Sequence, residues 1–221
     1  MDFRGPETAD YANVKSLNQA FLLRLRNTST GRHIRQQMPA PIQEVIRGLT
    51  DLHISRLAAA PFLLMSLREG DAGYWQALGS GETNLDLLEP GAGDVELGQL
   101  GVAGVAFLWQ LARRDPYAAR LVSGATLAWC EQLANDTLLG LLQRTASRRD
   151  LLQARLAGNA DFWNKLLGSG LSSEADVRLA AQMAALQTVL TDHPAARYRP
   201  LRAAACSSVA PSLQVAGKRQ R

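Results

Sequence analysis

Apolar residues recur along most of this chain with the period of a helix. In residues 9–26, Val14, Leu17, Phe21 and Leu25 follow one another at intervals of three or four positions, and charged side chains lie off that line. Such spacing places the apolar side chains on one face of a helix, where they can pack into a core. The segment is therefore predicted to be the first core helix.

Further helices are predicted from the same periodicity and from capping residues. Their expected ranges are residues 41–47, 51–60, 94–114, 115–144, 147–158, 159–168 and 173–190. Thr50 suits a helix N-cap, and Asp115 followed by Pro116 is a strong start signal, because aspartate accepts from free amides and proline fits the first turn. Since the first half of residues 115–144 almost lacks charge, this segment is expected to form one long helix through the core.

The last predicted helix repeats the heptad spacing of the first. Its apolar positions are Leu179, Met183, Leu186 and Leu190. No internal repeat is evident, and no alternation of apolar and polar residues outside residues 62–67 indicates a sheet. The expected fold class is all-α, a single helical domain of about seven to nine helices.

Composition divides the chain further. Residues 1–193 are expected to form the helical domain, in which a glycine-rich acidic link at 70–96 separates a first part, 9–69, from a helical core at 97–193. Residues 194–221 contain six Lys or Arg, no acid and few large apolar groups, so they are expected to be a disordered basic tail. The net charge of +4 belongs to this tail, and the rest of the chain carries a net charge of −2.

The stretch at residues 62–67 is a dense apolar run that periodicity assigns to neither helix nor strand. Pro61 and Gly70 separate it from the helices on either side, and short helices are expected beyond it near 74–78 and 83–88. Apolar and aromatic clusters with a charged rim are common at protein interfaces. The residues predicted to bind a partner are Phe62, Leu64, Met65, Leu67, Tyr74 and Trp75. The alternative is that the run threads the core of its own subunit.

The residue pattern predicts no catalytic site, no cofactor site and no metal site. The histidines at 33, 53 and 193 each lack a second ligand at helical spacing. Cys130 lies in an apolar helical segment, where a buried thiol is expected, and Cys206 lies in the tail. No cofactor is expected, and the chain is not expected to be an enzyme.

A cytoplasmic location is expected. The start of the chain lacks the apolar stretch of a signal peptide, and two distant cysteines do not make a disulfide framework. The longest uncharged run, residues 97–112, has 16 residues, whereas a membrane span needs about 20. Association with a membrane is therefore not expected.

Two stretches together resemble the D subunit of the bacterial flagellar master transcriptional activator. They are SLNQAFLLRLR at 16–26 and VIRGLTDLHISRLAAAPFLLMSLRE at 45–69. That family has a leucine-rich first helix, a short helix, a leucine–threonine step into a capped helix and an apolar run that ends in arginine. With residues 97–112 matched to the family's last helix, the likeness spans about 14–112.

The resemblance implies an all-helical, intertwined dimer that acts in transcription with a metal-binding partner subunit. This chain departs from the family in three ways. Met65 stands where the family can carry a cysteine that links its dimer, the acidic link is enlarged, and residues 115–221 have no counterpart. Of the properties that the resemblance implies, DNA contact is the one that these departures weaken most.

The function expected is that of a non-enzymatic regulatory or protein-interaction module, acting as a homodimer and through a protein partner. One alternative is a direct DNA-binding protein that uses the basic front end and tail. Residues 41–60 could form a helix-turn-helix, although a plain helical hairpin is favoured, because Asp51, His53, Ser55 and Arg56 are a poor set for reading bases. A third interpretation is a small-ligand carrier or an enzyme with a dispersed site.

Overall fold

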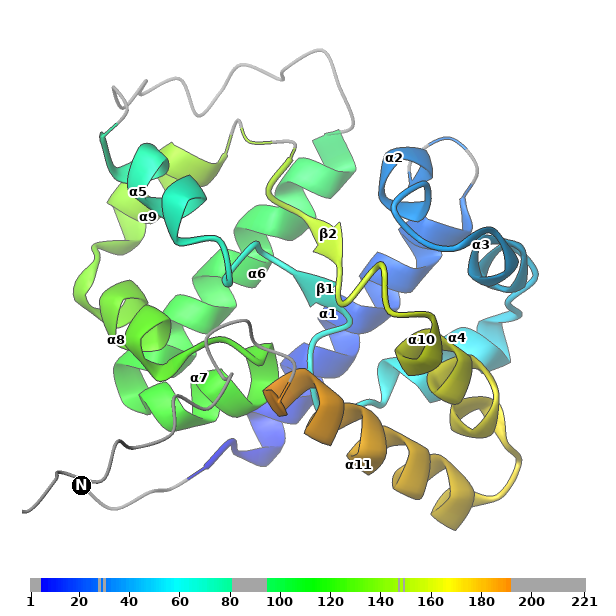
Figure 1. The fold of residues 1–221 in the computed structure, drawn as a ribbon. Coiled ribbons are helices and arrows are strands. Elements are labelled where there is room, and N and C mark those ends of the chain that lie inside the picture. The colour runs from blue at the N-terminus through cyan, green and yellow to red at the C-terminus, as the bar shows by residue number, and fades with distance from the viewer. Residues whose placement is uncertain are drawn as a thin grey trace, which may run out of the picture.

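The computed structural model describes residues 5–191 except 28, 30, 81–94, 147 and 149. This part of the chain is mostly helical, with two short strands (Figure 1). The elements are α1 (Thr8–Arg26), α2 (Arg32–Arg35), α3 (Ala40–Arg47), α4 (Asp51–Ala58), β1 (Met65–Ser66), α5 (Ala72–Ser80), α6 (Val95–Arg114), α7 (Pro116–Ser123), α8 (Leu127–Asn135), α9 (Leu138–Thr145), β2 (Gln153–Ala154), α10 (Ala160–Leu167), the 3-10 helix η1 (Ser169–Leu171) and α11 (Ala175–Thr191). The predominantly helical fold is confirmed, with more helices than expected.

Helix α1 lies between the two halves of the molecule. It packs against α3 and α4 on one side and against α6 on the other, as Figure 1 shows. Its side chains Val14, Phe21, Leu22 and Leu25 are fully buried, so its predicted apolar face does form part of the core. The described buried residues from Val14 to Val189 form one hydrophobic cluster.

The prediction of one long helix over residues 115–144 is wrong. Gly124 ends α7 in the left-handed conformation, with φ of 68°, and a Cβ there would lie 2.3 Å from a side-chain carbon of Val189. The hydroxyl groups of Thr126 and Thr137 then cap α8 and α9, each accepting a backbone N–H at 3.2 Å. Local capping therefore breaks the segment into three helices.

The prediction of a helix over residues 147–158 is also wrong. The described residues there form turns and β2, which pairs antiparallel with β1 so that Met65 faces Ala154 and Ser66 faces Gln153. Beyond the ladder, the Arg155 N–H donates to the Leu64 carbonyl at 2.9 Å. A helix here would satisfy its own backbone groups and leave those of the buried β1 segment without these partners.

The remaining predicted helices are found within a few residues of their expected ends. They are α3, α4, α6, α10 and α11, together with α5 near the expected 74–78. The helix predicted near 83–88 and the tail at 194–221 lie outside the described residues. Among the described residues, no helix combines the length and the apolar character needed to cross a bilayer.

Candidate partner-binding groove

The structure separates the predicted partner-binding residues into two groups. Four of them are fully or almost fully buried in their own chain: Phe62, Leu64, Met65 and Leu67. The expectation that this run is exposed is therefore wrong, and the alternative that it threads the core of its own subunit holds. Tyr74 and Trp75, which lie on α5, are only partly buried, and Trp75 lines a groove.

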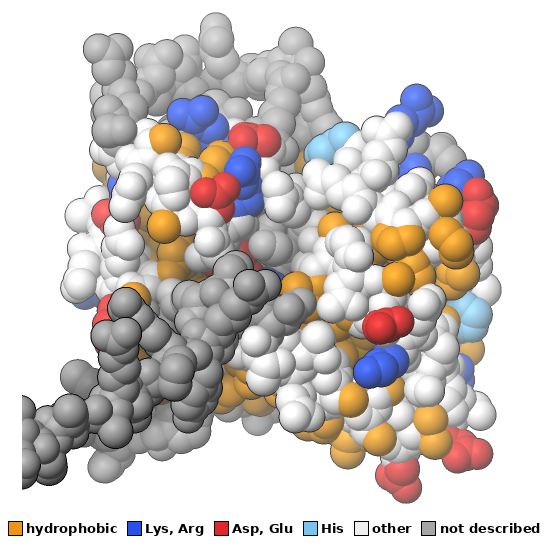
Figure 2. Space-filling model, viewed as in Figure 1, with side chains coloured by type: hydrophobic (Ala, Val, Ile, Leu, Met, Phe, Trp, Pro, Cys, Tyr) orange, Lys and Arg blue, Asp and Glu red, His pale blue; other side chains and the backbone are white. Residues whose placement is uncertain are grey.

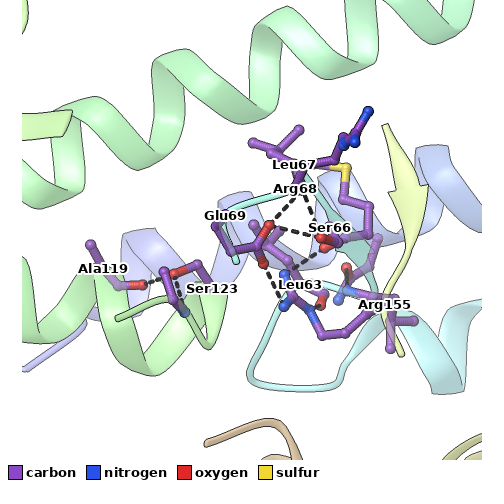
Figure 3. A network of polar contacts seen from close by, with 12 residues as sticks. Leu63, Ser66, Leu67, Arg68, Glu69, Ala119, Ser123 and Arg155 are labelled. Atoms are coloured by element: carbon purple, nitrogen blue, oxygen red, sulfur yellow. Dashed lines mark hydrogen bonds and ion pairs between the residues drawn. The ribbon is translucent and has the colours of Figure 1, made fainter. Parts of the chain in front are cut away.

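A buried ion pair between Arg155 and Glu69 holds the run in place (Figure 3). One guanidinium nitrogen of Arg155 lies 2.6 Å from a carboxylate oxygen of Glu69, and both side chains are less than a tenth exposed. Arg155 also donates from Nε to the Leu63 carbonyl at 2.5 Å and from Nη2 to the Met65 carbonyl at 2.7 Å. Charged donors of this kind satisfy carbonyl groups that no strand reaches.

The carboxylate of Glu69 fixes the turn that leads into α5. Its Oε2 accepts from the Ser66 hydroxyl at 2.8 Å and from the Leu67 N–H at 2.7 Å. The turn places Arg68 in the left-handed region, with φ of 55°, where a non-glycine residue needs support from its surroundings. Glu69 thus supports a strained residue whose side chain faces α5.

Asn18 provides the corresponding support from α1. Its side-chain amide donates to the Phe62 carbonyl at 2.8 Å, and its carbonyl oxygen accepts from the Leu64 N–H at 2.8 Å. Asn18 is fully buried, so both bonds are shielded from water. The buried run therefore has polar side-chain partners on two sides, which makes its burial energetically acceptable.

Arg68 ties α5 to the loop before β2. Its guanidinium lies 2.6 Å from Asp71 and 3.1 Å from Asp150, and it sits 4.0 Å from the centroid of the Tyr74 ring. The Tyr74 hydroxyl donates to Asp150 at 3.1 Å. Burial, followed by the nearby charge and hydrogen bond of Asp150, raises the pKa of Tyr74 to about 12. The ring of Tyr74 is consequently held in one orientation.

The neighbouring tryptophan forms the wall of the groove. The Trp75 indole N–H donates to the Arg68 carbonyl at 3.1 Å, which fixes the ring. The ring makes an edge-to-face contact with Trp129 from α8, with ring centroids 5.4 Å apart and planes at 74°. Asp71 positions α5 itself, because its carboxylate accepts from the Tyr74 N–H at 3.0 Å as an N-cap.

The groove lies between α5, α8 and α9 and has a volume of about 450 Å³. Its lining residues are Trp75, Gln76, Gly79, Trp129, Gln132, Leu133, Asn135, Asp136 and Arg144. Arg144 and Asp136 form an ion pair at 2.9 Å, and the Asp136 carbonyl accepts from the Trp109 indole at 2.8 Å. The site thus combines two indole rings with amides and a charged pair, which suits an apolar side chain that carries polar groups around it.

The other candidate residues show no reactive geometry. Cys130 is buried as expected, and burial raises the pKa of its thiol to about 12, so the thiol is protonated at neutral pH. Across the described residues, no group of three His, Cys, Asp or Glu side chains could hold a metal ion. His193 and Cys206 lie outside these residues.

Sequence reasoning missed most of the groove. Trp129 belongs to the segment 115–144 that is predicted to run through the core, and it is 7% exposed while contributing to the groove wall. Gln132, Asn135 and Arg144 were not singled out, because they lie on what was expected to be one straight helix. The signal that could have located them is Thr137, whose capping chemistry separates α8 from α9 and turns both toward α5.

Comparisons with models of protein families, with curated proteins and with solved structures find no match. The resemblance of residues 14–112 to the flagellar activator subunit therefore stays a prediction from the residues quoted above.

Proposed function

We propose that this chain is a non-enzymatic regulatory module that binds another protein, and that the groove beside Trp75 receives a segment of that partner. The observation that carries the proposal is the pair of indole rings, one of them half-buried, at the wall of a groove with a charged rim. Aromatic side chains in partly desolvated pockets supply much of the binding energy at protein interfaces. The resemblance to a transcriptional activator subunit supports a role in transcription.

The rigidity of the groove wall favours binding. Trp75 is held through its indole N–H, and it packs beside the ring of Tyr74, which is held through its hydroxyl and through the guanidinium over its ring. Side chains that are already ordered lose little conformational entropy when a partner docks. A partner segment with one large apolar side chain, flanked by groups that hydrogen-bond to Gln132 and Asn135, fits this chemistry.

Two glycines of α5 provide a matched test. A Cβ at Gly79, which lines the groove, would lie 3.7 Å from Arg144, an ordinary contact, so Gly79→Leu should fold and fill the groove. Gly73 is exposed on the same helix and does not line the groove, so Gly73→Leu is the control. Peptides selected from a random display library on the full chain would be titrated against both variants by tryptophan fluorescence.

Gly79→Leu is expected to weaken binding of the selected peptides by about tenfold or more, whereas Gly73→Leu is expected to leave it unchanged. Equal affinity for the two variants would show that the groove is not the binding site. A library that yields no binder at all would contradict the proposal as well.

A further inference from the structure

Helix α11 leaves some of its large apolar side chains exposed and buries mostly small ones. The residues that it buries are Ala181, Gln182, Ala185 and Val189, on the side that packs against α10 and η1 and, at Val189, against the end of α7. On the opposite side, Leu179 is 54% exposed and Met183 is 42% exposed. A surface helix of a monomer normally shows the reverse arrangement, because burial of large apolar groups contributes most to stability.

The exposed side of α11 also lacks charge. From Leu179 to Thr191 the helix contains no Asp, Glu, Lys or Arg. Figure 2 shows hydrophobic side chains along this part of the surface, at the lower right. Apart from glutamine and threonine side chains, this part of the helix is apolar. One side of α11 is covered by its own chain, and an exposed apolar cluster on the other side is typical of a surface that binds a partner.

The exposed side has a self-complementary pattern. We define the α11 stripe as Leu179, Met183, Leu186 and Leu190, of which the first two are exposed and the last two are partly buried, with Leu186 also in contact with the core. The intervals between them are four, three and four residues, which read the same in both directions. In an antiparallel pair of such helices, Leu179 of one copy lies opposite Leu190 of the other, and Met183 lies opposite Leu186. This is the knobs-into-holes spacing of helix pairs related by a two-fold axis.

We infer that two copies of this chain associate through the α11 stripe, in an antiparallel helix pair. This inference does not depend on the groove beside Trp75, which belongs to α5, α8 and α9. It also places the dimer contact away from residues 62–67, which the structure buries. The contact is assigned to the α11 stripe, which the heptad spacing predicts to be an apolar face and where Leu179 and Met183 are exposed in the single chain.

A second copy suits the stripe better than the chain's own basic tail does. Residues 194–221 contain six Lys or Arg, no acid and few large apolar groups. Near the stripe, α11 carries one acid, Asp176, seven residues before Met183, and the exposed positions beside the stripe, Ala180 and Gln187, are neutral, so little negative charge would attract such a segment. A second α11 provides four large apolar side chains at matching intervals, and antiparallel helix dipoles attract one another.

The size of the contact sets the expected strength of the dimer. A helix of 17 residues is about 25 Å long, and one face of it is smaller than the roughly 800 Å² that each partner buries in a stable interface. The dimer is therefore expected to dissociate on dilution, with a micromolar dissociation constant.

The test uses charge on two sides of the same helix. Leu179→Glu with Met183→Glu places two charges in the stripe, and Ala184→Glu places a charge on α11 at an exposed position outside it. Sedimentation equilibrium of the full chain, from low to high micromolar concentration, would measure the mass of each protein. Wild type and Ala184→Glu are expected to shift from monomer to dimer, whereas the double variant is expected to stay monomeric with an unchanged melting temperature measured at low concentration.

A wild-type chain that stays monomeric throughout this range would overturn the inference. If the double variant also lowers the melting temperature of that monomer, the stripe is covered by its own chain. A double variant that still forms the dimer would show that the copies meet through another surface. Peptide binding at the groove should be the same in all three proteins, so the two proposals can fail separately.

Discussion

Two apolar segments of this protein, residues 62–67 and the α11 stripe, differ in how their backbones are satisfied. Residues 62–67 form mostly irregular structure, so their polar backbone groups depend on partners elsewhere, chiefly Asn18 and Arg155. In α11 the helix satisfies its own backbone, and either side of it can face the core without loss of hydrogen bonds. An apolar segment without regular secondary structure can be buried where polar side chains form hydrogen bonds with its backbone N–H and C=O groups.

Residues 62–67 and α11 also differ in how many contacts they make with distant parts of the sequence. Arg155 joins residues that are about 90 positions away in the sequence, and its carbonyl accepts from the Trp163 indole at 3.0 Å. The buried run is therefore a point where distant segments meet. Helix α11 packs mainly against α10 and η1, its neighbours in the chain, and reaches distant segments at fewer points, where Val189 meets Gly124 and Gln182 donates to the Arg56 carbonyl.

The largest effect is expected from Arg155→Met. The substitution leaves the carboxylate of Glu69 and the carbonyl groups of Leu63 and Met65 buried without their donor, and loss of one partner of a buried ion pair costs about 3–5 kcal/mol. Arg47→Met, which breaks an exposed pair with Glu44, is the control and should cost at most about 1 kcal/mol. Urea unfolding would measure both; similar losses in the two variants would refute the role assigned to Arg155.

Removal of one leucine from each segment sharpens the comparison. Leu64→Ala opens a cavity in the core and is expected to lower the free energy of unfolding by about 2–5 kcal/mol. Leu179→Ala removes an exposed side chain and should change it by no more than about 0.5 kcal/mol in dilute protein, where the chain is monomeric. Equal losses by urea unfolding would mean that the α11 stripe is part of the core.

A smaller effect is expected for Asn18→Ala. The Phe62 carbonyl and the Leu64 N–H would remain buried without this partner, and such groups cost about 1–3 kcal/mol. Ser16→Ala on the same helix removes an exposed hydroxyl, and it should have little effect, about 0.5 kcal/mol or less. Thermal unfolding at fixed protein concentration would compare the two variants, and a silent Asn18→Ala would show that water replaces the amide.

The smallest effect concerns alkaline pH. The pKa of Tyr74 is raised from 10 to about 12, so the folded chain holds this proton more tightly than the unfolded chain. The stabilisation that results is present below pH 10 and is lost as the pH rises through about 12. Ultraviolet titration should show a late-ionising component that disappears in Tyr74→Phe and remains in Tyr11→Phe. Tyr74→Phe with an unchanged titration curve would contradict the assignment.

The sequence allowed prediction of the elements that depend on nearby residues. Helices α1, α4 and α10 were located from heptad spacing and from caps such as Thr50, whose hydroxyl accepts from the His53 N–H as expected. Asn159 caps α10 in the same way through the Phe162 N–H. These contacts span three residues or fewer, so the local sequence contains the information for them.

The features that were missed depend on distant contacts. The end of α7 requires the close approach of Gly124 to Val189, and β2 forms where Arg155 reaches Leu63. The groove depends on the first of these features, because the break in the predicted long helix allows Trp129 to pack against Trp75. Apolar spacing alone also does not distinguish a side covered by the same chain from a side left for another, which is why the exposure of the α11 stripe could not be predicted.

The central claim is that residues 62–67 are closed to solvent in the single chain while the α11 stripe is open. Thiol labelling tests it most directly, with Leu64→Cys and Leu179→Cys each made in a Cys206→Ser background, where the remaining Cys130 is buried. In dilute native protein, the cysteine at position 179 is expected to react at nearly the rate of the unfolded chain, and the one at position 64 only when the protein unfolds. Equal labelling rates at the two positions would contradict the account.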